Sequence, residues 1–235
     1  MDDHERPWNR ERLRTPAPYR TKQEFAYRRL RDAIMRCELA PGQRLVIDEI
    51  ARRLRVSAMP VREALHLLQS EGLVVNVPHV GATAAPIAPH AIHEVFTILE
   101  GLEMVATREA VARLRPEDVV ELDGLLESMD EALRSGAYER WSELNSRFHV
   151  VISAITRMPL LREMTERVLG QWDRVRRHYF EGVLVPRAET AQREHHELLA
   201  AMKAGDLAAA ETVVRQHNRG ALVDYSEFIC RHEER

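Results

Sequence analysis

The sequence contains few aromatic residues and two cysteines, and it has no long apolar run. Phe, Trp and Tyr make up 6% of the 235 residues, whereas charged residues make up 30%, a balance that favours a soluble helical protein. No apolar run approaches the roughly 20 residues needed to cross a bilayer, and the N-terminus lacks the apolar core of a signal peptide. Cys37 and Cys230 form neither a metal-type spacing nor a disulfide framework, so we expect a cytoplasmic protein without membrane contact.

Charge is distributed unevenly along the chain. The net charge is −3, yet residues 1–87 carry 15 Lys and Arg against 11 Asp and Glu, and the remainder is acidic. A basic front fits a phosphate-binding module joined to a second domain, although such an asymmetry also arises by chance. The length is sufficient for two modest domains, each with its own core.

The N-terminal third shows a series of short helical patterns. Residues 1–19 are polar and hold three prolines, so they predict a flexible arm. Apolar residues at helical spacing predict a helix over 21–37, which Pro41-Gly42 separates from the next segment. Asp48 is a good N-cap for a second helix, Asp48–Leu54.

A third helix follows after a very short turn and is the surest feature of the chain. Ser57 is a suitable N-cap for a helix over Ser57–Ser70, Pro60 falls in its first turn where no N–H is needed, and Gly72 ends it. Two short apolar segments then surround a turn, which predicts a β-hairpin up to Ala84. Two helices, a tight turn and a hairpin make a winged helix-turn-helix domain, expected over residues 20–87, which places the third helix in the major groove of DNA.

Candidate DNA contacts lie on the third helix and on the loops beside it. Arg62 can bind guanine or a phosphate group, and Ser57 with the N–H groups of the helix end can hold a phosphate. Arg44 is a further phosphate candidate, and His79 at the tip of the wing could enter the minor groove. The alternative is that these are ordinary solvated surface residues. The full candidate set is Arg44, Ser57, Ala58, Met59, Arg62 and His79.

The remaining chain is helical throughout after Pro86 and Pro89. Prolines and Gly205 divide it into expected helices, and the second domain is expected over residues 88–232. The helices are expected near residues 90–114, 116–134, 138–155, 159–181, 187–204 and 206–231.

Histidines in this second domain could meet at one point. His195 and His217 lie at similar distances on either side of Gly205-Asp206, so a helical hairpin turning there would set both imidazoles at the same height. His149 from a third helix would complete a set suited to Zn²⁺, Ni²⁺ or a similar ion. The alternative is accidental symmetry, because the chain has 11 histidines.

The first third resembles the GntR superfamily of bacterial regulators. The resemblance rests on Pro41-Gly42-Gln43-Arg44-Leu45, on Val56 to Leu65 and on Glu71-Gly72-Leu73. It implies operator binding, but the family usually has Arg-Thr at Ala58-Met59 and a turn glycine at Arg55. A different operator or a weaker affinity is therefore expected, with Arg62 as the main remaining reader.

The second domain resembles the FCD ligand-binding domain of the FadR subfamily, which forms an antiparallel helical bundle. The resemblance rests on Asn145 to His149, Glu194-His195, and Gly205-Asp206 through His217. It implies that Asn145, His149, His195 and His217 bind a divalent metal that helps to hold a small carboxylate effector. The family usually has Asp at the first position, so the neutral Asn145 should weaken metal binding, and His196 is expected to point away.

The expected carboxylate-binding arginine is absent from its usual place. Aligning Leu102-Glu103 with the Leu-Glu pair of the family puts Leu99 at the position of that arginine. Arg174, Arg176 or Arg177 could replace it, or these three could form a solvated basic face.

The prediction is thus a mainly α protein, with a winged helix-turn-helix followed by an antiparallel all-helical bundle. It is expected to be a homodimeric transcription regulator, most simply a repressor, that binds a double-stranded DNA operator. An organic acid is expected to control this DNA binding. A metal hydrolase would need a carboxylate base near the histidines, and Glu194 is expected to face elsewhere on its helix. A metal-free dimerisation bundle on a DNA-binding head is the other alternative, and no enzyme activity is expected.

Overall fold

The protein is described here by a computed structural model covering residues 21–233, and the predicted arm at 1–19 lies outside the described residues. Contacts divide the chain into two compact units, the first ending at Pro86 and the second beginning at Ile87. Each unit has its own buried apolar core. Among residues 21–233, no helix combines the length and apolar content that a membrane span requires.

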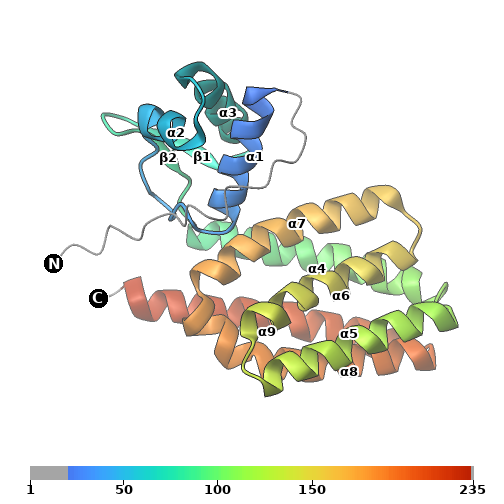
Figure 1. The fold of residues 1–235 in the computed structure, drawn as a ribbon. Helices are drawn as coiled ribbons and strands as arrows, with labels where there is room; N and C mark the ends of the chain where they lie inside the picture. The colour runs from blue at the N-terminus through green and yellow to red at the C-terminus, as the bar shows by residue number, and fades with distance from the viewer. Residues whose placement is uncertain (1–20, 234–235) are drawn as a thin grey trace. The chain divides into compact units, whose positions relative to one another are not determined.

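The first unit is a winged helix-turn-helix, as predicted (Figure 1). Its α1 and α2 both pack on α3, and the β1–β2 hairpin follows. Thr21 caps α1, since its Oγ1 accepts a hydrogen bond from the Glu24 N–H at 3.0 Å. Leu30, Ile34 and Leu68 are fully buried at the centre of its core. The elements are α1 Lys22–Met35, α2 Ile47–Leu54, α3 Ala58–Ser70, β1 Val74–Val77 and β2 Gly81–Ala84.

The start of α2 differs from the prediction. The helix begins at Ile47 with Val46 as its N-cap, so Asp48 stands in the first turn and is not the cap. The reason is that Leu45 N–H pairs with the Ala82 carbonyl at 2.8 Å, after which Val46 already accepts from Ile50 at 3.0 Å. Asp48 still favours the helix electrostatically, because a negative charge near the N-terminus opposes the helix dipole.

The turn between α2 and α3 is held by a strained residue. Arg55 is the C-cap of α2 and has φ 56° and ψ 43°, the left-handed conformation. A residue with a Cβ pays roughly 1 kcal/mol for this conformation, whereas glycine adopts it freely. Ser57 is the N-cap of α3 as predicted, although its side chain makes no capping hydrogen bond.

The wing is a short antiparallel hairpin. Val74 pairs with Ala84 and Val77 with Gly81, which leaves His79 in the connecting turn with φ 63°. Arg44 bridges to Thr83, so the segment that follows α1 lies along the wing.

The second unit is a bundle of long helices that run side by side (Figure 1). Helix α4 packs on α6, α7 and α9, and α8 packs on α5 and α9. The helices are α4 Pro89–Val111, α5 Pro116–Arg134, α6 Tyr138–Ile155, α7 Pro159–His178, α8 Val185–Ala204 and α9 Leu207–Glu233.

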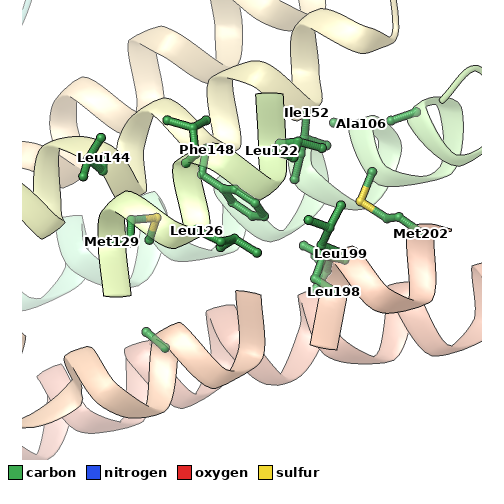
Figure 2. Packing of buried hydrophobic residues seen from close by; sticks show 14 of the residues in the cluster. Ala106, Leu122, Leu126, Met129, Leu144, Phe148, Ile152, Leu198, Leu199 and Met202 are labelled. Atoms are coloured by element: carbon green, nitrogen blue, oxygen red, sulfur yellow. The ribbon is translucent and has the colours of Figure 1, made fainter. Parts of the chain in front are cut away.

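Two apolar clusters fill this bundle. The larger is mainly aliphatic and joins α5, α6 and α8 around Leu122, Met129, Phe148 and Leu199 (Figure 2). The smaller is aromatic and lies between α4, α7 and α9, with Phe96, Trp172 and Tyr225 at its centre. The candidate site described below lies where these two clusters meet, because residues of both clusters line it.

The connection between α7 and α8 corrects the predicted helix ends at 181 and 187. A π-helical segment, Phe180–Leu184, leads directly into α8, and Pro186 stands in the first turn of that helix, where it disrupts nothing. A Cβ at Gly182 would lie 2.3 Å from the tip of the Phe228 ring, so a larger residue there would force this ring to move.

Candidate functional site

Three imidazoles from three helices meet inside the bundle. His149 on α6, His195 on α8 and His217 on α9 have ring centroids 4.8 to 5.4 Å apart. One ring nitrogen from each lies within 4.8 Å of the others. The sequence prediction that these histidines converge therefore matches the geometry of the bundle.

The turn between α8 and α9 produces this convergence. Gly205 has φ 67° and closes α8 in the left-handed conformation, and the Asp206 Oδ1 accepts from the Ala209 N–H at 3.0 Å to start α9. Helix α8 runs toward this turn, α9 runs away from it, and the two helices pack together. His195 and His217 are at similar distances from the turn, so they lie at the same level along the helix pair. Asn145 lies one turn before His149, so it shares that face of α6.

A buried carboxylate, Glu103, and a half-buried one, Glu194, contact the imidazoles from behind. His149 Nδ1 lies 2.8 Å from Glu103 Oε1 on α4, and His217 Nδ1 lies 2.8 Å from Glu194 Oε2 on α8. A carboxylate beside Nδ1 favours the tautomer that carries the proton there, in which Nε2 keeps its lone pair available to an ion. The expectation that Glu194 faces elsewhere was wrong, since it reaches His217 across the α8–α9 contact.

Burial and these contacts set the charge of the site. Burial alone would raise the pKa of Glu103, but the adjacent His149 and His217 and a hydrogen bond from Asn218 lower it overall. Burial alone would likewise raise the pKa of Glu194, but the hydrogen bond from His217 and the charge of Arg187 lower it overall. Burial holds the pKa of His195 well below its usual range, and the charges of His217 and His149 lower it further. The site therefore combines ionised carboxylates with a neutral His195 ready to bind a metal.

Several buried polar atoms at the centre lack a partner among the described residues. Both ring nitrogens of His195 and the Asn145 Oδ1 are buried without a hydrogen bond. Such atoms are rare in proteins because each costs the free energy of its lost hydration. A cation would satisfy one nitrogen of His195 and the Asn145 Oδ1 together, so the donor set fits a divalent metal.

The spacing of the donors is slightly open for a small ion. Around Zn²⁺, with bonds of roughly 2.0 to 2.1 Å, ligand nitrogens lie about 3.3 Å apart. The upper separation of 4.8 Å between the three histidine nitrogens would therefore close by about 1.5 Å on binding. Side-chain rotation is sufficient for such a change.

A cavity opens beside the histidines. Its polar end contains Glu103, Asn145, His149, His217 and Asn218, and most of the rest is apolar. The complete lining also includes Phe96, Leu99, Trp141, Leu169, Trp172, Leu184, Arg187, Ala188, Ala191, Ala221 and Tyr225.

The arginine that reaches this cavity is Arg187, which the sequence reasoning did not identify. It makes ion pairs with Glu194 at 3.0 Å and Asp224 at 2.8 Å, and it donates to the His217 carbonyl at 2.9 Å. Its place two turns before His195 on α8 was the available signal. Glu103 could also have been predicted, because it lies one turn after Leu99 on the same face of α4.

The three arginines predicted to bind the effector do not line the cavity. Arg174 and Arg176 are buried and Arg177 is half-buried, so a solvated basic face is also wrong for the first two. Arg176 donates to Asp173 at 2.7 Å, one turn beyond Trp172, the last residue of α7 that lines the cavity. All three predicted arginines follow Trp172 in the helix, beyond the part of α7 that lines the cavity.

Outside the cavity, His196 contacts Asp130 at 3.1 Å and lies apart from the histidine cluster, as expected. In the first unit, the predicted DNA-contacting side chains are on the surface. Arg62 and Ser57 are exposed, and Met59 is 61% exposed at the start of α3. Arg44 and His79 are exposed and Ala58 is half-buried. These positions leave the outward face of α3 and the wing open to a ligand.

Comparison with known proteins identifies both units. Residues 22–83 match the family described as "Bacterial regulatory proteins, gntR family", and residues 94–220 match the "FCD domain". The HTH-type transcriptional regulator McbR of Escherichia coli (strain K12) is 32% identical over 168 residues, which are 72% of this chain and 76% of that protein.

A second relative and a solved structure extend the similarity. The HTH-type transcriptional repressor RspR of E. coli (strain K12) is 29% identical over 191 residues, covering 81% of this chain and 83% of its own. The solved structure of E. coli McbR/YncC superimposes with a TM-score of 0.71 at 27% identity, covering 89% of this chain and 99% of the other.

Proposed function

Since the chain belongs to the gntR family of bacterial regulatory proteins and carries an FCD domain, it is a DNA-binding transcription regulator, and we propose that a divalent metal and a small carboxylate control its binding to DNA. The observation that carries this proposal is the cluster of His149, His195 and His217 beside a cavity. The lining of that cavity combines apolar and aromatic side chains with a few convergent polar groups, which is typical of small-molecule sites.

The three histidines and Asn145 would hold the metal, with Glu103 and Glu194 fixing two of the rings. A bound Zn²⁺, Ni²⁺ or similar ion would supply a positive centre for a carboxylate oxygen. None of the four ligand side chains is an anion, so the ligands themselves would not offset the charge of the ion toward the effector. The same lack of an anionic ligand weakens the affinity for the ion relative to a site with an aspartate.

Control of DNA binding follows from linkage. The effector changes operator affinity only if it binds the DNA-competent and DNA-incompetent states with different free energies. Repression released by the effector is the simplest form, and RspR among the relatives is named as a repressor. Arg62 on α3 would read the operator from the major groove, with Ser57 and Arg44 on phosphates.

Pairing of two chains is part of this proposal, because one winged helix contacts too few base pairs for useful specificity. An exposed apolar face of α4 supports a second copy as the occupant. Ile98 and Val105 are 41% and 43% exposed, and Gly101 between them has open space at its Cβ position. In a two-fold antiparallel crossing at Gly101, Glu94 of one copy faces Arg108 of the other, although Arg108 also contacts Glu211.

Metal analysis of the purified protein tests the site. His195→Ala combined with His217→Ala should abolish bound metal and the response of operator binding to effector, whereas His196→Ala should retain both. The His196 variant is a matched control because that ring contacts Asp130 and lies outside the cluster. A wild-type protein that binds no metal and shows no effector response would favour a plain dimerisation bundle.

Catalysis is the less favoured alternative. Glu103 and Glu194 both contact imidazoles through the Nδ1 side, and Glu194 is also paired with Arg187. Neither is thus positioned as a general base toward a metal-bound water. Turnover of a carboxylate by the metal-loaded protein would revive this alternative.

A further inference from the structure

The cavity has an aromatic end opposite the histidines. Along α9 its lining runs from His217 to Tyr225, which is about 12 Å of helix at 1.5 Å per residue. Along α4 it runs from Glu103 to Phe96, about 10 Å. A ligand that fills the cavity therefore meets polar groups at one end and aromatic rings at the other.

Three rings form that second end. Phe96 and Trp172 meet edge to face with centroids 4.9 Å apart, and Trp172 meets Tyr225 in the same way at 5.1 Å. Leu99 and Leu169 add apolar walls. A flat ring from a ligand would join this cluster through further edge-to-face contacts, which contribute beyond the burial of area.

The hydroxyl of Tyr225 is a polar group without a partner at this end. The side chain is fully buried, it lines the cavity, and its hydroxyl makes no hydrogen bond within the described residues. Burial also raises the pKa of Tyr225, so the hydroxyl keeps its proton and can both donate and accept. An unsatisfied hydroxyl in an otherwise apolar wall indicates a ligand group that pairs with it.

Charge at the cavity limits the ligand to one acid group. Of the described residues that line the cavity, Arg187 is the sole arginine and none is lysine. Arg187 is already matched by Glu194 and Asp224. A second carboxylate buried beside Leu99 and Leu169 would compete with Glu194 and Asp224 for Arg187, the one cation of the lining, and that burial is unfavourable.

We propose that the effector is an aromatic monocarboxylate carrying a hydroxyl on the far side of its ring. Its carboxylate lies at the histidine end, its ring among Phe96, Trp172 and Tyr225, and its hydroxyl pairs with that of Tyr225. The placement of the carboxylate rests on the proposed function, whereas recognition of the ring and its hydroxyl rests on the aromatic end alone.

Titration calorimetry with defined acids tests this specificity on the full chain, with and without added Zn²⁺. The probes are 4-hydroxyphenylacetate, 4-methylphenylacetate and succinate. The 4-hydroxy acid should bind about tenfold more tightly than its methyl analogue, the value of one well-made hydrogen bond. Binding should quench tryptophan fluorescence, since Trp141 and Trp172 line the cavity.

Tyr225→Phe should remove the preference for the hydroxyl, so that the 4-hydroxy and 4-methyl acids bind alike. Its melting temperature without ligand should be unchanged or higher, because the lost hydroxyl is unsatisfied. Tyr138→Phe is the control, because Tyr138 packs against the larger apolar cluster. This variant should keep the tenfold preference for the 4-hydroxy acid. If the metal-loaded wild type binds succinate as tightly as the aromatic acids or more tightly, the aromatic assignment is overturned and the metal–carboxylate function stands. If the wild type binds neither added Zn²⁺ nor any of the three acids, both proposals are overturned.

Discussion

Replacement of Glu103 by glutamine tests how the buried carboxylates act on the metal site. Glu103 is on α4, 2.8 Å from His149 Nδ1, and its other oxygen accepts from Asn218 Nδ2 at 2.7 Å. Glutamine has nearly the same volume and still offers an oxygen to Asn218, but it removes the negative charge beside the imidazole. We expect the fold to be retained and the affinity for Zn²⁺ to fall.

The magnitude follows from the role of the carboxylate. Loss of a group that orients a ligating histidine costs about 10- to 100-fold in metal affinity, or roughly 1.4 to 2.7 kcal/mol. Competition with a chromophoric chelator measures this directly. Glu100→Gln is the matched control, because Glu100 lies on the same helix but accepts from Arg219 at the surface. If Glu103→Gln binds Zn²⁺ within twofold of wild type, Glu103 does not orient His149.

Four further outcomes are expected. Arg62→Ala should weaken operator binding at least tenfold in a gel-shift titration. Arg134→Ala, which changes an exposed arginine of the second unit, should leave operator binding unchanged. Equal losses in the two variants would mean that Arg62 does not contact operator bases. Ile98→Asp should shift the protein toward monomer in sedimentation velocity, and an unaltered dimer would exclude this face of α4. Phe148→Ala should destabilise by about 3 to 5 kcal/mol in urea, because the ring is fully buried. Asn145→Asp should tighten Zn²⁺ binding yet weaken carboxylate binding, and a looser metal site would mean that Asn145 is not a ligand.

Features set by short-range patterns were predictable from the sequence. Thr21, Pro60 and Gly205 act at helix ends, and each stands where local backbone chemistry requires it. The convergence of His195 and His217 followed from their similar distances to one turn, since α8 and α9 rise equally per residue. The contact between His149 and these two rings depends on the packing of α6 but fitted the same spacing.

Contacts between distant helices were less predictable. Glu194 was expected to face away because a single helix was considered, yet its partner His217 lies on the neighbouring helix. Arg174 and Arg176 were predicted to reach the cavity from their sequence position, and the structure buries them two and four residues beyond Trp172, the last residue of α7 in the lining. In the same way, Tyr225 has no motif around it, and its importance arises from rings on α4 and α7.

The two substitutions at the site have linked electrostatic consequences. The resemblance to the FCD domain implies an aspartate at the position of Asn145 and an arginine at that of Leu99, so that a divalent ion, one negative ligand and one cation would total +2. In this chain Asn145 and Leu99 are both neutral, so at these positions a bound ion alone would supply +2. The attraction for a single carboxylate is therefore kept, but its source is concentrated at the metal and the opposite wall becomes apolar. Restoring only the aspartate would lower the total to +1, which is why Asn145→Asp should improve the metal site at the expense of the acid. A cavity with charge at one end and aromatic rings at the other selects for ligands with the same division.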